Sequence, residues 1–353
     1  MKTYFNIKTF LAIVAIVVAA CSGQSEQQTS SNNNQEEITP TKRPPVFSLF
    51  NNKERDRYQI YRNTDKLTSF SLTSGQYPLR MHSYHGDCYI LVSRQIDSTG
   101  IKSAEILKNG KPAMSFDSLF SVTDFDMDNG HFYVLGSFGD TSIYVLRDGI
   151  KNLSIKRKPN HIPLKISIFK QDIFVAIQHN DSVEIYRNDK HEFSLPGRCS
   201  DMRASYMGIF TVAGDTVFRD KKSFMWRRKY QAFDTELLAA VPQMITLTNS
   251  NCYIGTTSTI DGEKTYTCIF RWQQNYTTTK PDDKPIGKSA LSTTFAGITA
   301  CGETEVYFAS ITLDEKMNPV IPREIHYFLN RDECFKIPLE SADMQLFSMV
   351  AEE

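Results

Sequence analysis

Charged side chains recur at alternate positions in four separate segments of this sequence. They are Arg80 and His82, Asp124 and Asp126, Lys165, and Asp201 and Arg203. Alternate side chains of a β-strand point to the same side of a sheet, so each pair would face one surface. Carboxylates, an imidazole and cations gathered in one pocket could transfer protons or bind a small polar ligand. Opposite charges on neighbouring strands could equally form ion pairs that serve only the fold.

Two other motifs have the residue types of metal sites. The segment Asp124–Gly130 has the alternating carboxylates of a calcium loop, but Leu135 stands where the bidentate glutamate is required. We interpret it as a strand that runs into an Asp-Asn-Gly turn. His82 and His85 lie close to Asp87, and we interpret them as residues that flank a turn. The sequence has no Cys-x-x-Cys pair and no Gly-x-Ser-x-Gly elbow. We therefore predict no catalytic residue, no metal and no cofactor.

Two short patterns repeat along the chain and predict the elements that position these residues. The first is a strand with a central aromatic residue at Tyr89, Tyr133, Phe174, Phe210, Tyr253, Tyr307 and, more faintly, Phe347. These aromatics are 44, 41, 36, 43, 54 and 40 residues apart, which is typical of the blades of a β-propeller. The second is a strand that enters a tight turn, often Asn-Gly or Asp-Gly, which is a hairpin signal. Its copies are Ile60–Asn63, Ile106–Gly110, Val145–Gly149, Ile185–Asp189, Val217–Asp220, Ile269–Trp272 and Tyr327–Asn330.

Before most of the aromatic strands the apolar residues alternate, which predicts one more strand, the innermost of each unit. The predicted fold is all-β, a β-propeller of seven four-stranded blades, with six blades or a generic β-sandwich as alternatives. A lone copy of the second pattern opens the array at Tyr58–Ser71, and a lone copy of the first closes it at Met344–Val350. We expect the two termini to complete one blade, because ring closure leaves no free sheet edge. The charged residues above would then border the central channel.

The N-terminus has the features of an export signal. Lys2 and Lys8 precede an apolar run, Phe10–Ala20, that is too short to span a bilayer. The run ends in Val-Ala-Ala before Cys21 and resembles the lipobox of bacterial lipoproteins, which implies that the Cys21 thiol is acylated. An ordinary cleaved signal is the alternative. By the same resemblance, Ser22 after the cysteine favours the outer membrane of the cell envelope.

The predicted organisation is a signal peptide (1–20), a lipidated cysteine with a disordered tether (21–46) and a propeller domain (47–353). The tether is rich in Gln, Asn and Ser, so it lacks apolar surface to bury. Removal of the signal leaves 38 basic and 40 acidic residues, which argues against nucleic acid as a partner. The remaining cysteines need not pair, but Cys252 and Cys268, expected on adjacent strands of one hairpin, are the pair considered for a disulfide.

Two functions are compatible with this organisation. In the preferred hypothesis, a membrane-anchored binding or scaffold propeller engages a protein or glycan through the face that carries its long loops. Those loops are expected at Gln95–Lys102, Ser258–Glu263, Thr312–Pro322 and Gln273–Phe295. In the alternative, a propeller hydrolase or lyase acts at the channel mouth through Asp124, Asp126 or His82, which requires a carboxylate or imidazole that is not consumed by ion pairs. The chain resembles exported β-propeller lipoproteins as a group, and that resemblance implies no particular substrate.

Overall fold

The computed structural model describes most of the chain from Pro44 onward. The described residues are 44–52, 57–73, 75–94, 104–116, 120–139, 141–226, 228–231, 237–260, 264–273, 287–288, 293–301, 305–313, 320, 323–330, 332–341 and 343–352. They form strands and connections only, and a search of them finds no helix with the length and apolarity needed to cross a membrane. The predicted signal peptide, Cys21 and the tether up to residue 43 lie outside them.

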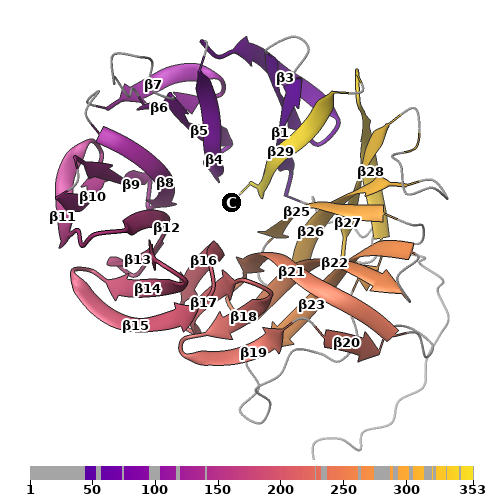
Figure 1. Ribbon diagram of the computed structural model, residues 1–353. Helices are drawn as coiled ribbons and strands as arrows, with labels where there is room; N and C mark the ends of the chain where they lie inside the picture. The colour runs from indigo at the N-terminus through magenta and orange to yellow at the C-terminus, as the bar shows by residue number, and fades with distance from the viewer. Residues whose placement is uncertain are drawn as a thin grey trace, which may run out of the picture. The chain divides into compact units, whose positions relative to one another are not determined.

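The strands form seven antiparallel sheets arranged in a ring (Figure 1). Blade 1 contains β4 (Gln76–Tyr84), β5 (Asp87–Arg94), β6 (Ala104–Lys108) and β7 (Lys111–Ser115). Blade 2 contains β8 (Phe120–Asp128), β9 (His131–Phe138), β10 (Ser142–Arg147) and β11 (Ile150–Lys156). Blade 3 contains β12 (His161–Phe169), β13 (Asp172–His179), β14 (Ser182–Arg187) and β15 (Lys190–Pro196). Blade 4 contains β16 (Cys199–Ser205), β17 (Gly208–Ala213), β18 (Thr216–Arg219) and β19 (Lys222–Trp226).

Two of the last three blades, blades 5 and 7, depart from this simple order. Blade 5 contains β20 (Arg228–Gln231), β21 (Leu237–Leu247), β22 (Asn251–Ile260), β23 (Lys264–Gln273) and β24 (Gly287–Lys288). Blade 6 contains β25 (Thr293–Cys301), β26 (Glu305–Thr312), β27 (Glu324–Leu329) and β28 (Asp332–Pro338). Blade 7 contains β29 (Met344–Ala351), β1 (Val46–Asn52), β2 (Arg57–Arg62) and β3 (Asp65–Ser71). The predicted seven-bladed propeller is confirmed, and blade 5 has one strand more than predicted.

Both termini build blade 7, as predicted, but they divide it differently. The C-terminal strand β29 is the innermost strand, and the N-terminal strand β1 lies second, antiparallel to it. The aromatic residue of the second strand is therefore Phe47, opposite Arg62, and not Phe347. The predicted tether extended to residue 46, whereas Val46 already lies in β1 and is fully buried.

An aromatic side chain and a cation face each other across the second and third strands of several blades. The Lys or Arg charge lies 5.7–5.9 Å from the ring centroid, within the range of a cation–π contact. The pairs are Phe47 with Arg62, Tyr89 with Lys108, Tyr133 with Arg147, and Phe174 with Arg187. In these four blades the contact joins the two sequence patterns.

The turn between the third and fourth strands is tied to the second strand by its first residue. That residue is an Asn or Asp with φ between 49° and 55°, a left-handed conformation that these types tolerate best. Its side-chain oxygen accepts a hydrogen bond from a backbone N–H near the start of the second strand. Six blades share this arrangement, through Asn63, Asn109, Asp148, Asn188, Asp220 and Asn330.

The hydrophobic core consists of clusters that lie between neighbouring blades. Phe210 of blade 4 packs on Trp272 of blade 5 with ring centroids 5.4 Å apart, and both side chains are buried. Phe47 and Leu49 of blade 7 similarly share a cluster with Met81 and Ile90 of blade 1. Because each sheet buries both faces against its neighbours, the inner strands are held side by side around the channel.

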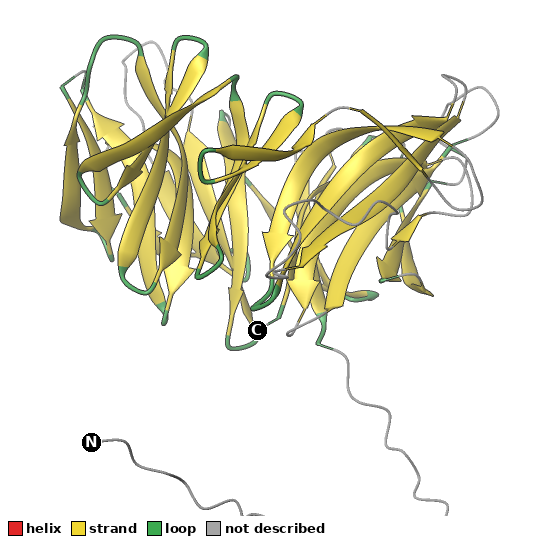
Figure 2. Cartoon of the chain, turned by 90° about the horizontal axis from the view of Figure 1, so that it is seen from below, coloured by secondary structure: helices red, strands yellow, loops and turns green. Residues whose placement is uncertain are grey.

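The ring has two distinct faces, and Figure 2 shows the strands running between them. One, the tight-turn face, carries the turns between the first and second strands and between the third and fourth. The other, the loop-bearing face, carries the connections between second and third strands and between blades. The predicted long loops lie wholly or partly outside the described residues. Within two of them the structure has strand instead, because β22 continues to Ile260 and β24 forms the outer strand of blade 5.

The disulfide considered between Cys252 and Cys268 is not formed. Both residues are buried on the β22–β23 hairpin, but Cys252 lies opposite Trp272 and Cys268 lies opposite Thr256. The register thus separates them by four residues along the strands, roughly 13 Å at about 3.3 Å per residue. A disulfide requires Cα atoms within about 7 Å.

Replacement of Asn63 by alanine should lower the free energy of unfolding by about 1–3 kcal/mol. The change leaves the buried N–H of Val46, 2.9 Å from Asn63 Oδ1, without its acceptor. Urea denaturation monitored by circular dichroism measures the loss. Asn63→Asp keeps an acceptor oxygen and should remain close to the unmodified chain. Equal destabilisation by both variants would contradict this role of the Asn63 side chain.

Candidate functional site at the channel mouth

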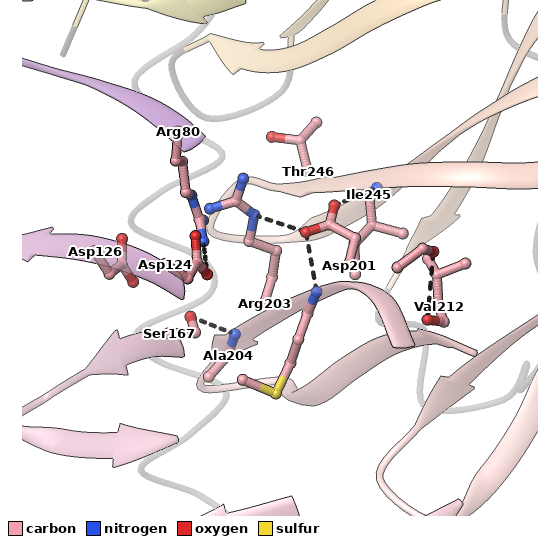
Figure 3. Close-up of polar contacts among 12 residues, drawn as sticks. Arg80, Asp124, Asp126, Ser167, Asp201, Arg203, Ala204, Val212, Ile245 and Thr246 are labelled. Atoms are coloured by element: carbon pink, nitrogen blue, oxygen red, sulfur yellow. Dashed lines mark hydrogen bonds and ion pairs between the residues drawn. The ribbon is translucent and has the colours of Figure 1, made fainter. Parts of the chain in front are cut away.

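The innermost strands β4, β8, β12 and β16 bring the seven sequence-predicted residues to the central channel, and Figure 3 shows several of them. A cavity of about 700 Å³ occupies the channel, and its lining continues to the tight turns that follow the inner strands. Six of the predicted residues line it, namely Arg80, His82, Asp126, Lys165, Asp201 and Arg203. The seventh, Asp124, is 1 % exposed and lies behind them. The sequence therefore identified a real cluster.

Arg80 and Asp124 form a buried ion pair between blades 1 and 2. Arg80 Nη1 donates to Asp124 Oδ2 at 2.6 Å, and the same oxygen accepts the N–H of Ile166 in blade 3 at 3.0 Å. Burial alone would lower the pKa of the Arg80 guanidinium, but the charges of Asp124, Asp126 and Asp201 raise it. Arg80 is thus permanently charged and is held by the carboxylates around it.

Asp126 lies between His82 of blade 1 and the backbone of blade 3. Its Oδ2 accepts the N–H of Ile168 at 2.8 Å, and its Oδ1 accepts the N–H of Met127 at 3.0 Å. His82 Nε2 lies 3.3 Å from Oδ1 without the geometry of a hydrogen bond. Burial raises the pKa of Asp126 to about 6 against the effect of Arg80 and the two N–H donors. Burial also lowers the pKa of His82 well below its ordinary value, and the charge of Arg80 adds to this.

Asp201 links blade 4 to blade 5 in the same way. Its Oδ2 accepts the N–H of Ile245 at 3.0 Å, and its Oδ1 accepts the N–H of Met202 at 2.9 Å and lies 4.0 Å from Arg203 Nε. Burial raises the pKa of Asp201, although the charges of Lys165 and Arg80 oppose the shift. This carboxylate, too, is held by backbone donors of the strands that it joins.

Uncharged side chains make equivalent links around the rest of the ring. Ser167 accepts the N–H of Ala204 at 3.0 Å, Thr246 accepts that of Ala300 at 2.9 Å, and Thr299 accepts that of Ala351 at 3.0 Å. Ser83 of blade 1 donates to the carbonyl oxygen of Ala351 in blade 7 at 2.5 Å. Together with the carboxylates, these contacts place a polar link at each of the seven interfaces between neighbouring blades. Sequence reasoning from charge alone missed these hydroxyl groups.

These contacts limit the chemistry of the channel mouth. The alternative function, a hydrolase or lyase, needed an unengaged acid or base, but Asp124, Asp126 and Asp201 all accept backbone N–H groups. What the described part of the channel does offer is donors. Arg80 Nη2 and Arg203 Nε are buried and have no hydrogen-bond partner there. The arrangement can bind a small polar group, and His82 beside Asp126 is its contact between an imidazole and a carboxylate.

The two histidines considered as a metal pair, His82 and His85, are not brought together. His85 lies in the tight turn after β4 with φ of 49° and stacks edge-on against Tyr84, whereas His82 faces the channel. A different cluster, His161, His179 and Glu184, was missed by sequence reasoning. Its signal was the hairpin register, which places His161 directly opposite His179.

Asp126→Asn should flatten the dependence of stability on pH between about pH 4 and pH 6. The native carboxyl has a pKa of about 6 against 3.8 for a free one, so the folded chain binds the proton more tightly. Its contribution to stability is therefore present at low pH and is lost as the pH rises through about 6, by up to about 3 kcal/mol. Urea unfolding of both proteins at several pH values measures the difference, and identical profiles would contradict the assignment.

Comparisons with known proteins give only distant structural matches. No protein-family model and no curated protein matches this chain. Among solved structures, the designed protein Ika8 has a TM-score of 0.49 at 9 % identity, covering 87 % of this chain and 90 % of its own. Kluyveromyces lactis Hsv2 has a TM-score of 0.43 at 10 % identity, covering 83 % and 99 %. BBS1N, solved in complex with ARL6DN, has a TM-score of 0.39 at 11 % identity, covering 64 % and 74 %.

Proposed function

We propose that this protein is a non-catalytic binding propeller, anchored in the cell envelope through a lipid on Cys21, whose loop-bearing face engages a protein partner. The observation that carries the proposal is the set of apolar side chains exposed at that face of three consecutive blades. Tyr77 of blade 1, Phe138 of blade 2 and Ile162 of blade 3 are 43 %, 41 % and 52 % exposed. Each lies at the loop-bearing end of its strand.

Exposed apolar side chains on adjoining units favour a protein partner over a glycan. Clusters of aromatic and aliphatic residues on a rigid scaffold are typical of protein interfaces, where their burial supplies binding energy. Such side chains offer few hydrogen bonds to the hydroxyl groups of a sugar. A glycan remains the second outcome that the experiment below distinguishes.

The first described residues, Pro44 and Pro45, are fixed to the propeller by hydrogen bonds. Pro45 O accepts the N–H of Glu352 at 2.8 Å, and Pro44 O accepts the hydroxyl of Tyr307 at 3.3 Å. These contacts lie at the tight-turn face, where β1 begins and β29 ends. The described part of the chain therefore begins on the face opposite the exposed side chains of the proposed interface.

The channel supports binding over catalysis. Its carboxylates are engaged by backbone donors of neighbouring blades, so they serve to hold the ring together. A rigid ring is what a scaffold needs, since a preformed surface loses little conformational entropy when it binds.

Ile162→Ser and Tyr77→Ser should each weaken partner binding about tenfold or more, because each removes apolar area from the proposed interface. Affinity capture from solubilised envelope of the source cells, followed by binding measurements with the captured protein, tests this. The matched control is Ile150→Ser, which removes a 75 % exposed isoleucine from the tight-turn face. Equal capture by all three variants, or loss of binding on treatment of the partner with glycosidase and not with protease, would reject a protein-binding surface here.

Cys21→Ser should move the protein from the membrane fraction to the soluble fraction, because serine lacks the thiol that would be acylated and the anchor is lost. Mass spectrometry of the N-terminal peptide of the unmodified chain should show fatty acyl groups on Cys21. Cys334→Ser, a change in the propeller, serves as the control and should stay with the membrane. An unmodified Cys21 in the mature protein would refute the anchor while leaving the binding surface to be judged separately.

A further inference from the structure

Two histidines and a glutamate converge at the loop-bearing end of blade 3. His161 begins β12, His179 ends β13 directly opposite it, and Glu184 lies on the adjacent strand β14. His179 Nδ1 lies 2.9 Å from Glu184 Oε1, and His161 Nε2 lies 3.5 Å from Glu184 Oε2. One ligand atom from each residue lies within 4.8 Å of the other two. Ligand atoms around a tetrahedral zinc ion are roughly 3.3 Å apart, so small rotations suffice to surround a cation.

The ring nitrogens of His161 make no hydrogen bond among the described residues, and the side chain is fully buried. A buried polar group without a partner costs free energy, so natural proteins rarely retain one without a ligand, water or function.

Glu184 is prepared to act as an anionic ligand. Tyr186 donates its hydroxyl to Glu184 Oε2 at 2.8 Å and so orients the carboxylate, as outer-shell groups do in metal sites. Lys158 Nζ lies 3.4 Å from the same oxygen, but its side chain is 54 % exposed and can turn into solvent.

We propose that His161, His179 and Glu184 form a binding site for a divalent transition-metal ion of the zinc class. Two imidazoles and one carboxylate favour such an ion over calcium or magnesium, which prefer oxygen ligands. Three protein ligands leave a coordination position for water or a ligand group. His179 also borders an open hollow of about 520 Å³ that is lined by residues 179–182 and 194–196. The proposal is independent of the partner surface proposed above.

Zinc titration of the untagged full chain by calorimetry tests the site. We expect one Zn²⁺ per chain and a higher midpoint of thermal unfolding in its presence, because only the folded chain presents all three ligands. Cobalt substitution should give the visible absorption of a site with nitrogen ligands and without a thiolate band. His179→Gln and Glu184→Gln should weaken zinc binding by more than about a hundredfold, beyond the 10–100-fold typical of outer-shell changes.

Two controls separate this site from other metal-binding groups. His191→Ala removes an exposed histidine of the same blade, and Cys334→Ser removes the cysteine that is only partly buried, so neither should alter zinc affinity. His179 and Glu184 were chosen for substitution because replacement of the fully buried His161 could unfold the chain, and circular dichroism of each variant verifies its fold. The proposal is overturned if the unmodified chain binds no zinc, or if folded His179→Gln or Glu184→Gln binds it as tightly.

Discussion

The structure depends on polar links between neighbouring innermost strands, one at each interface of the ring. A propeller closes only if its first and last units meet, and here the last of these links, from Thr299 and Ser83 to Ala351, attaches β29 to the blades on both sides. β29 in turn pairs with β1, which belongs to the other end of the chain. Without that pairing, blade 7 would present two open sheet edges, and the channel would lose one wall.

The same constraint explains why charge is buried so deeply in this protein. An isolated carboxylate at Asp124 or Asp201 would be costly to remove from water. Each instead accepts a backbone N–H group of the next blade and lies near a cation, which is Arg80 of blade 1 for Asp124 and Arg203 of the same strand for Asp201. The backbone donors need partners in any case, because the inner strands have no further strand to pair with on the channel side. The carboxylates thus satisfy backbone donors at an inner sheet edge.

Much of the fold could be predicted because its signals are local. Alternating apolar residues, the recurring aromatic and the Asx turn each depend on a few neighbouring residues, and together they gave the blade number and the closure. The division of blade 7 could not be obtained in this way, because Phe347 resembles the other aromatics and only the cation opposite Phe47 distinguishes the true second strand. Long-range register was also out of reach. It separates Cys252 from Cys268, and it brings His161 to His179 across a whole hairpin.

The site was predicted to a similar extent and for the same reason. Period-two spacing predicted the inner strands that carry the seven charged residues, six of which line the channel cavity. Each carboxylate, however, accepts a backbone N–H group of the next blade, and that contact leaves no signal in the sequence. In the sequence, nothing distinguishes Thr246 and Thr299, which link neighbouring blades, from other threonines in strands. The difference between a reactive carboxylate and a structural one therefore became visible only when the strands were assembled.

The links around the channel are chemically unequal. Those between blades 1 and 3 and from blade 4 to blade 5 rest on ionisable groups, whereas those from blade 5 through blade 7 and back to blade 1 rest on hydroxyls. The fold favours the protonated forms of Asp126 and Asp201, so a change of pH alters the ionisable links and leaves the hydroxyl links, including the one between blades 3 and 4, unchanged. A nearly symmetric architecture is thus unevenly sensitive to pH, and Asp126 makes its part of the ring less stable as the pH rises through about 6.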